Sequence, residues 1–289
     1  MEFIASQPAT LLEVLGLNYP DCSKATLRSW INERRISVNG TIVKRTDKAI
    51  ATGDAILVGK KKVLIASRFP VIYSDKDIIL IDKPSGLLSV ATDFDKKDNV
   101  FSLLKEHFYP REVFVVHRLD QDTSGVMMFA LSAPAFRVLK TKFAAHDIVR
   151  RYTAIVEGSL TTPGTWDSYL YEDKNYVVRF AKNPGEGERA ITHFKPLMTE
   201  RHYTWLELTL ETGKKNQIRV QCLHAGCPVV GDKKYGPTES PLKRLCLHAH
   251  HLEFDHPITG KRVVFTSAVP TSFYRLLDPR KLPEFKANL

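Results

Sequence analysis

The sequence predicts an α+β protein in which a large domain with a mixed, largely antiparallel sheet follows a small αβ domain. Near the N-terminus a helical pattern is followed by an Asn-Gly hairpin signal, and after about residue 69 strand patterns dominate. With 289 residues, the chain is long enough for one large or two ordinary domains. We therefore expect two domains, residues 1–62 and 63–289, joined at the lysine run that ends at Lys62.

A short helix is the first element that the small domain predicts. Ser23 is a suitable N-cap for a helix over residues 25–34. Leu27, Trp30 and Ile31 recur at helical spacing, so this stripe is expected to pack inward. Arg28 and Arg35 are then expected to face outward.

A β-hairpin follows this helix. Apolar residues alternate over residues 36–43 on both sides of Asn39-Gly40, which is a strong hairpin signal. The turn Thr52-Gly53-Asp54 then precedes an apolar strand over residues 55–58. The small domain therefore combines a helix with short strands.

The large domain is predicted to consist mainly of strands, with two helices between them. The alternation over residues 202–210 indicates a strand with one buried and one more polar face. The helical patterns cover residues 100–108 and 134–145. The other clear strand patterns cover residues 77–81, 151–156 and 262–265.

The charge of the chain favours a polyanionic partner. The formal net charge is +10, and residues 24–62 hold ten Lys and Arg against three acidic residues, a net charge of +7. Clustering of this kind favours RNA or DNA over a scattered, solvated surface, with an anionic membrane as the second choice.

Composition also suggests where the protein works. No run approaches the roughly 18–20 apolar residues that a membrane span needs. The N-terminus lacks the basic and apolar regions of a signal peptide. The four cysteines show no disulfide framework spacing, so we expect a reducing cytoplasm and no membrane association.

The segment His117–Gly125 is the first candidate for chemistry. It places a cation, a carboxylate, two hydroxyls and a glycine between two apolar segments that have strand character. A polar turn at the edge of a core can hold reactive side chains on a rigid scaffold, which makes Asp120 the leading candidate. The same residue types also make ordinary turns through local backbone hydrogen bonds.

Further segments carry a resemblance to a known family. They are Ile81–Leu88 with its Lys-Pro-Ser-Gly turn, Arg151–Gly158, Glu211–Val220, and Gly226–Asp232 followed by Tyr235-Gly236. Together with His117–Gly125 they resemble the RluA-type pseudouridine synthases, whose signature is HRLDxxTSG. Asn216 and Gln221 depart from that pattern, because many relatives carry histidine at these two positions.

This resemblance implies an RNA uridine isomerase. The enzyme breaks the bond from ribose to N1 of uracil, turns the base and rejoins it through carbon 5. No atoms enter or leave, so the resemblance implies no cofactor. It assigns the role of nucleophile or base at the sugar to Asp120. Arg219 is the implied partner that lowers the pKa of this carboxylate.

The resemblance gives roles to Tyr152, Arg118 and Lys83 as well, and each of these residues and Arg219 has an alternative. Tyr152 is implied to stack on uracil and assist proton removal, but it also suits a packing position in a strand. Arg118 is implied to displace the target base, and a phosphate clamp or a structural ion pair is the alternative. Arg219 would otherwise be an ordinary surface arginine on a strand. Lys83 fits RNA contact and structural support equally well.

Residues 8–59 resemble the S-four-type RNA-binding domain, through the order helix, basic turn, Ile-Ser-Val-Asn-Gly and Gly-Asp-Ala-Ile. In that family the helical face and the loop before the hairpin contact RNA. The matching basic positions are Arg28, Arg34, Arg35 and Lys44.

The expected partner is RNA. The two resemblances favour large-subunit ribosomal RNA, and transfer RNA stays open because the catalytic motifs read only the flipped uridine. We expect a monomer. A non-catalytic RNA-binding or ribosome-assembly factor is the alternative class. A metal hydrolase, suggested by His248–His251 and by Cys222, His224 and Cys227, lacks the paired spacings of common zinc sites, so no metal is expected.

Overall fold

The chain divides into two compact units, Met1–Val63 and Leu64–Asn288, which are described here one at a time. The structure is a computed structural model, and it describes residues 2–33, 35–59, 64–65, 68–91, 98–181, 183, 185–236 and 240–277. The lysine run at the expected junction lies outside the described residues.

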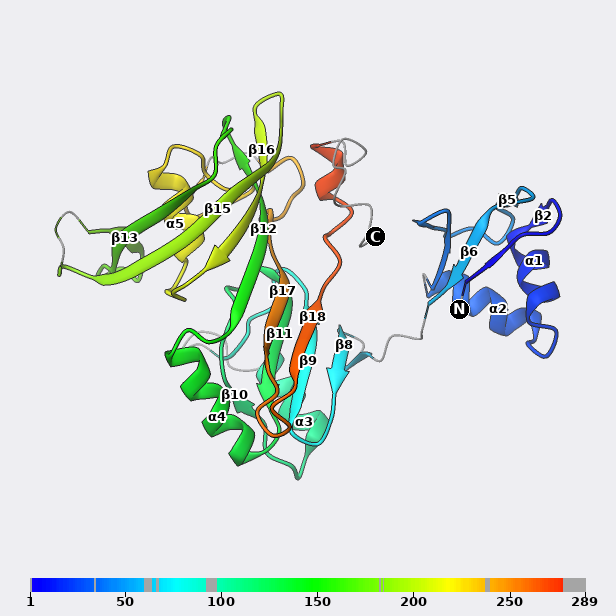
Figure 1. Ribbon diagram of the computed structural model, residues 1–289, viewed down its shortest axis with the longest axis horizontal. Helices are drawn as coiled ribbons and strands as arrows, with labels where there is room; N and C mark the ends of the chain where they lie inside the picture. The colour runs from blue at the N-terminus through cyan, green and yellow to red at the C-terminus, as the bar shows by residue number, and fades with distance from the viewer. Residues whose placement is uncertain are drawn as a thin grey trace. The chain divides into compact units, whose positions relative to one another are not determined.

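The small unit packs two helices against short strands (Figure 1). Its main sheet has the order β1-β6-β3-β4, and β2 pairs with β5. Apolar side chains from both helices and from β3 and β6 form one core. The elements are β1 Glu2–Ile4, β2 Ala9–Thr10, α1 Leu11–Asn18, α2 Lys24–Asn32, β3 Ile36–Val38, β4 Thr41–Ile42, β5 Ala49–Ile50 and β6 Ala55–Val58.

The predicted helix and hairpin of this unit are confirmed. Ser23 caps α2, because its Oγ accepts a hydrogen bond from the Thr26 N–H at 3.1 Å. Strands β3 and β4 pair antiparallel. Both turn residues between them are left-handed, Asn39 with φ 50° and Gly40 with φ 76°, as the Asn-Gly signal requires.

Arg35 corrects one prediction for this unit. Its guanidinium lies 4.7 Å from the ring centroid of Trp30, and its Nε donates to the Gly59 carbonyl at 3.0 Å. Only 15% of the side chain is exposed, so the expectation that Arg35 faces outward is wrong. Packing against Trp30 holds the arginine inward, which leaves its head unable to reach a ligand freely. Arg34 lies outside the described residues.

The large unit is built on one twelve-stranded sheet. The order along its main path is β14-β13-β15-β16-β12-β17-β11-β9-β8-β7, with β10 paired to β11 and β18 paired to β17. The pair β11–β17 is parallel, and the other pairs between described strands are antiparallel. A mixed, largely antiparallel sheet and the α+β class are thereby confirmed.

The strands of the large unit are β7 Leu64–Ile65, β8 Phe69–Ser74, β9 Ile78–Lys83, β10 Phe114–Val115, β11 Ser124–Ala130, β12 Val149–Glu157, β13 Gly164–Glu172, β14 Val178–Phe180, β15 Glu188–Glu200, β16 Tyr203–Leu210, β17 Leu247–Asp255 and β18 Arg262–Thr266. Its helices are α3 Val100–Phe108, α4 Ala133–Ala144, α5 Gln217–His224 and the short 3-10 helix η1 Phe273–Arg275.

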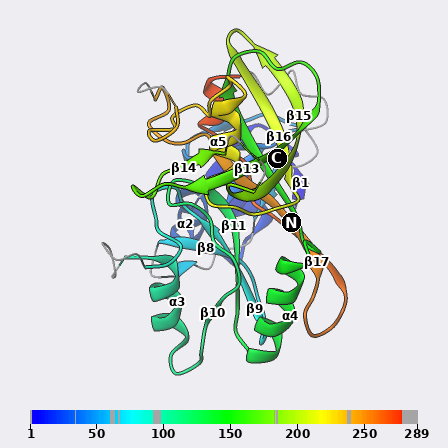
Figure 2. The ribbon, with the colours of Figure 1, turned by 90° about the vertical axis from the view of Figure 1, so that its left-hand side faces the viewer.

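Strands β9 and β11 are buried on both faces, which explains their continuous apolar runs. Met127 and Phe129 of β11 point into the core that α3 covers. Val126, Met128 and Ala130 of the same strand point into the core that α4 covers. Figure 2 shows α3 and α4 on opposite sides of these strands. A strand fixed from both sides is a rigid base for the loop that precedes it.

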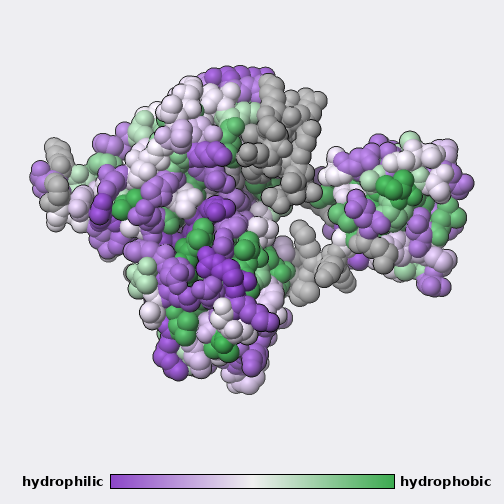
Figure 3. All heavy atoms as spheres, in the orientation of Figure 1, coloured by the Kyte–Doolittle hydropathy of each residue, from purple (hydrophilic) through white to green (hydrophobic). Residues whose placement is uncertain are grey.

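The surfaces of the two units are mainly hydrophilic on the face seen in Figure 3, with smaller hydrophobic areas between. In the small unit, the exposed apolar side chains include Ile4, Leu17, Ile42 and Leu57. No helix in the described ranges has both the length and the hydropathy needed to span a bilayer.

Candidate active site

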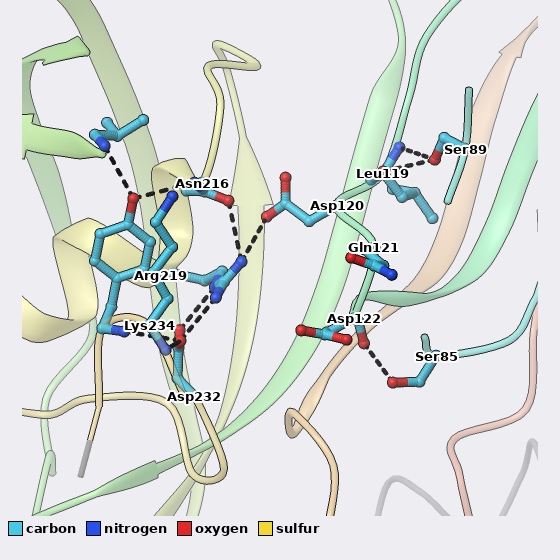
Figure 4. A network of polar contacts seen from close by, with 12 residues as sticks. Ser85, Ser89, Leu119, Asp120, Gln121, Asp122, Asn216, Arg219, Asp232 and Lys234 are labelled. Atoms are coloured by element: carbon cyan, nitrogen blue, oxygen red, sulfur yellow. Dashed lines mark hydrogen bonds and ion pairs between the residues drawn. The ribbon is translucent and has the colours of Figure 1, made fainter. Parts of the chain in front are cut away.

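Asp120 lies in the loop between β10 and β11, and a neighbouring turn binds the backbone of this loop on several sides. Ser89 Oγ donates to the Leu119 carbonyl at 2.6 Å and accepts from the Leu119 N–H at 3.1 Å. Ser85 Oγ donates to the Asp122 carbonyl at 2.7 Å. Figure 4 shows these two serines beside the loop. The Lys-Pro-Ser-Gly turn that the sequence singled out therefore positions the loop of Asp120.

Lys83 completes this anchoring from inside the protein. Its Nζ donates to the carbonyls of Pro84, Leu87 and Gln121 at 3.0, 2.6 and 2.8 Å. The residue is fully buried, and burial lowers the pKa of Lys83 to about 7. All three ammonium protons have acceptors, so the prediction that Lys83 contacts RNA is wrong and its role is structural support.

The residues after Asp120 join the loop to the centre of the sheet. Ser124 and Gly125 begin β11 and pair in parallel with His248 and Ala249 of β17. A Cβ on Gly125, which has φ 118°, would lie 2.1 Å from the Ala249 carbonyl oxygen, so only glycine fits. The turn residues of the motif thus act as a scaffold for Asp120.

One cavity of about 460 Å³ brings the candidate residues together. This volume lies in the range of small-molecule sites, about 300–1,000 Å³. Leu119 and Ile218 form apolar parts of the wall. The cavity is also lined by Arg118, Asp120, Tyr152 and Arg219, whereas Lys83 is not among its lining residues.

Arg219 reaches this cavity from a helix, which corrects the expected strand. The alternation of Ile218, Arg219 and Val220 resembles a strand pattern, but these residues belong to α5. All of the first six residues of α5 are buried, so the helix has no polar face to reveal its period. Its polar side chains are satisfied by hydrogen bonds inside the protein; Gln221, for example, donates to Ser168 Oγ at 2.9 Å.

Arg219 lies between two carboxylates, as Figure 4 shows. Its Nε and Nη2 each donate to Asp232 at 2.7 Å, in a buried bidentate pair. Toward Asp120 a single Nη1 contact spans 3.5 Å, and the same Nη1 donates to Asn216 Oδ1 at 3.0 Å. The guanidinium is therefore bound mainly by Asp232, and it neutralises Asp120 only in part.

The pKa of Asp120 reflects this arrangement. Burial raises the pKa of Asp120 above its ordinary value of 3.8, although the charges of Arg219 and Arg118 act in the opposite direction. The predicted effect of Arg219 is present, because its charge and its hydrogen bond lower the pKa of Asp120, but burial outweighs this effect and the net direction is upward. A carboxylate with a raised pKa is more basic than an exposed one, which suits a nucleophile or a base.

Tyr152 lies on β12 and lines the cavity with its mostly buried ring. Burial raises the pKa of Tyr152 to about 12, Arg150 lowers it, and the charge of Asp120 raises it further. Within the described residues, its hydroxyl makes no hydrogen bond. The tyrosine is thus protonated near neutral pH, and it presents an uncommitted hydroxyl beside Asp120.

The remaining candidate cations are exposed. Arg118 lines the cavity and makes no hydrogen bond or ion pair within the described part of the chain. Arg28 and Lys44 are exposed on the small unit. These three side chains are available for a polyanionic ligand.

Two residues of the site lacked a predicted role. Asp232 belongs to the Gly-Asp segment already noted in the sequence, but its pairing with Arg219 depends on tertiary structure. Asn216, noted as a departure from the family pattern, has φ 53° just before α5 and donates from Nδ2 to the Tyr235 hydroxyl at 3.1 Å. The left-handed conformation suits asparagine better than histidine, and it sets the position at which α5 begins.

The histidines and cysteines considered for a metal site have other partners. Ser124 Oγ accepts from Arg244 at 2.6 Å and lies 2.8 Å from His248 Nδ1, to which it can donate. Burial lowers the pKa of His248 to about 3, so this ring is neutral. Among the described residues, no group of three or more His, Cys, Asp or Glu is arranged to hold a metal ion.

The site geometry can be compared with known proteins. Residues 77–224 match the family model described as RNA pseudouridylate synthase, a span that includes Asp120, Tyr152 and Arg219. The chain belongs to this family. Its members are isomerases that form pseudouridine in RNA, so the large unit is a catalytic unit that acts on an RNA substrate.

Relatives along nearly the whole chain support this membership. The chain is 31% identical to the ribosomal large subunit pseudouridine synthase D of Yersinia pestis, over 96% of this chain and 93% of the relative. It is 30% identical to the protein of the same name from Escherichia coli K12, over 92% and 89%. The similarity therefore extends into the small unit.

Solved structures agree on the fold. Human RNA pseudouridylate synthase domain containing 4 aligns with a TM-score of 0.58 at 23% identity, over 71% of this chain and 92% of that chain. Human RNA pseudouridylate synthase domain containing 1 aligns with a TM-score of 0.57 at 21% identity, over 69% and 83%. The catalytic fold of the large unit is thus a pseudouridine synthase fold.

Proposed function

We propose that this enzyme isomerises specific uridines of large-subunit ribosomal RNA, with Asp120, Tyr152 and Arg219 as its catalytic residues. The observation that carries the proposal is the meeting of these three side chains in one cavity. The names of the relatives support the choice of ribosomal over transfer RNA. The four free cysteines agree with a reducing compartment, so we propose that the protein works in the cytoplasm. We also propose that it is a monomer.

Asp120 acts at the sugar in this proposal. The ionised carboxylate serves as nucleophile or base while the bond from ribose to N1 breaks, and the released uracil carries the bonding electrons. Asn216 and Asp232 hold Arg219 beside the carboxylate, so the guanidinium stabilises its charged form without pairing with it fully. Water is limited by the apolar walls at Leu119 and Ile218.

Tyr152 and Arg118 act on the base. The ring of Tyr152 supports the uracil while it turns, and the hydroxyl assists removal of the proton from carbon 5 after the new bond has formed. Arg118 enters the space that the extruded uridine leaves, since chemistry on a stacked base requires extrusion at a cost of a few kcal/mol. Its exposure at the mouth of the cavity suits this role.

We also propose that the small unit is an S-four-type domain that binds RNA through exposed cations, among them Arg28 and Lys44. The test is the double variant Arg28→Gln with Lys44→Gln in the full chain. Each substitution should remove about one phosphate contact. The slope of the logarithm of the binding constant against the logarithm of the salt concentration should then become shallower by about 1 per contact. The matched control is Arg45→Gln, because Arg45 already pairs with Asp47. An unchanged salt dependence in the double variant contradicts this part of the proposal.

The experiment for the main proposal uses unmodified RNA. Large-subunit ribosomal RNA and a transfer-RNA pool, both transcribed in vitro, are incubated with the purified protein, and pseudouridine is mapped chemically. We expect new pseudouridines at defined positions of the ribosomal RNA alone. New sites only in transfer RNA would contradict the proposed substrate, and no site in either RNA would contradict the activity.

A further inference from the structure

Arg150 is a buried cation in the wall of the cavity, and its charge has no carboxylate partner among the residues that the structure describes. It lies on β12, two residues before Tyr152, and only 8% of it is exposed. In the described part of the chain it forms no ion pair and makes one hydrogen bond, from Nη2 to the Glu211 carbonyl at 2.7 Å. Its buried Nε has no acceptor among the described residues.

Such an arrangement is costly unless a ligand completes it. A guanidinium has five N–H donors, and buried charges in proteins are normally paired and hydrogen-bonded. Burial lowers the pKa of Arg150, which reflects the missing anion. Arg219, in the same cavity, is held by Asp232 and Asp120, so the contrast between the two arginines is internal to one site.

The surroundings hold Arg150 in place. Its guanidinium packs 5.9 Å from the ring centroid of Phe143. The loop after β16 passes so close that a Cβ on Gly213 would lie 2.5 Å from Nη1 of Arg150. Glycine at this position and the carbonyl of Glu211 therefore form a seat for the guanidinium at the cavity wall. The cation is positioned, and the described residues supply no anionic partner for it.

The charge of the cavity indicates the chemistry of that partner. Lys214, another lining cation, pairs with Glu188 at 2.6 Å. Arg118 and Arg150 have no carboxylate partner in the described residues, and Asp120 is the only acidic residue of the lining. The anion that an RNA enzyme meets at every nucleotide is the backbone phosphate, which arginine binds in a fork geometry.

We propose that Arg150 binds a backbone phosphate next to the target uridine and so fixes the nucleotide against Tyr152 and Asp120. This inference rests on the proposed function, since it requires an RNA substrate in the cavity. Binding adds charge-assisted hydrogen bonds to donors that are otherwise unsatisfied. Arg150 is in this account a substrate-binding residue that positions the uridine.

The test is a binding cycle with a short single-stranded RNA that contains one uridine flanked by adenosines. The phosphate on either side of the uridine is replaced, one at a time, by a neutral methylphosphonate. Affinities are measured for the wild-type full chain, for Arg150→Gln and for the control Arg151→Gln. Arg151 occupies the next position of β12, so the control removes the same charge from the opposite face of the sheet.

We expect one replacement to weaken binding to the wild type and to Arg151→Gln by about tenfold or more, the usual effect of losing a hydrogen bond to a charged group. Arg150→Gln should bind the unmodified RNA about tenfold more weakly than the wild type. The affinity of Arg150→Gln should not fall further when the same phosphate is replaced by the methylphosphonate. If Arg150→Gln loses as much as the wild type at both positions, the proposal is overturned.

Two further variants keep the test decisive. Gly213→Ala retains the arginine but displaces its guanidinium, and it should reduce the coupling to the same phosphate; it replaces Arg150→Gln if that variant does not fold. Arg150→Lys keeps a cation and should retain part of the coupling. Arg150→Gln could instead shift the pH dependence of kcat while leaving the effect of the phosphate replacement unchanged. Arg150 would then act by lowering the pKa of Tyr152, and the proposal would be overturned. Isomerisation of ribosomal RNA by the wild type tests the proposed function separately.

Discussion

The two loops that meet at Arg219 differ in how firmly each holds its carboxylate. Asp232 is 1% exposed and receives two hydrogen bonds of 2.7 Å from the guanidinium and two more from the backbone N–H groups of Lys234 and Tyr235. The side chain of Asp120 is 26% exposed, and it receives one contact of 3.5 Å from the guanidinium and one from the backbone of Asn216. Asp232 is therefore held more firmly than Asp120, whose side chain is more exposed.

In the proposed mechanism, this difference lets Asp120 lie beside an arginine without being fully neutralised by it. A full bidentate pair with Arg219 would hold the pKa of Asp120 low and occupy both oxygens. Burial raises the pKa of Asp120 by more than the contact with Arg219 lowers it. The arginine acts against burial by favouring the charged form of Asp120.

Removal of Arg219 should have the largest effect on the protein. Arg219→Gln leaves Asp232 buried without its partner, and the free energy of unfolding should fall by about 3–5 kcal/mol. The matched control is Arg189→Gln, which breaks a bidentate pair with Asp167 that is about half exposed. This control should cost at most about 1 kcal/mol. Equal losses in urea unfolding would contradict a structural role for the Asp232 pair.

A smaller effect, confined to the Asp120 side, is expected from Tyr152→Phe. The rate of pseudouridine formation should fall by about a hundredfold or more, because the variant lacks the hydroxyl that assists proton removal. The free energy of unfolding should change by less than about 0.5 kcal/mol, since this hydroxyl makes no hydrogen bond in the described part of the chain. Tyr169→Phe, outside the cavity, serves as the control and should keep full activity.

The smallest effect is a change in pH dependence in Asp232→Asn. The reaction needs ionised Asp120, so kcat/KM should fall as pH falls through the raised pKa of Asp120. In Asp232→Asn the guanidinium acts more fully on Asp120 and lowers its pKa. The acid limb of the profile should then move to lower pH, measured on protein verified as folded. An acid limb that stays in place or moves to higher pH would contradict the claim that Asp232 limits the effect of Arg219 on Asp120.

The sequence predicted much of this fold, because several signals are local. The hairpin at Asn39-Gly40, the cap at Ser23 and the helix Val100–Phe108 all depend on residues within a few positions of one another. The motif around Asp120 is local in the same sense, and Asp120 lines one cavity together with Tyr152 and Arg219. Elements specified by such local patterns form in any fold that buries their apolar side.

The predictions that failed depend on tertiary contacts. Helix α5 is buried around its circumference, so its residues show no helical period and resemble a strand. The pairing of Asp232 with Arg219 joins residues that no local pattern connects, and the burial that raises the pKa of Asp120 also depends on tertiary packing. Lys83 gains three carbonyl acceptors from two separate segments, which turns an expected RNA contact into a structural support.

The most direct test of Asp120 as the reacting carboxylate is pseudouridine formation by Asp120→Asn on unmodified large-subunit ribosomal RNA, measured together with RNA affinity. We predict that the rate falls by about a thousandfold or more, since the amide can act neither as nucleophile nor as base. RNA affinity should stay within a few-fold of the wild type, because the cations of the site remain. Full activity in Asp120→Asn would contradict the account.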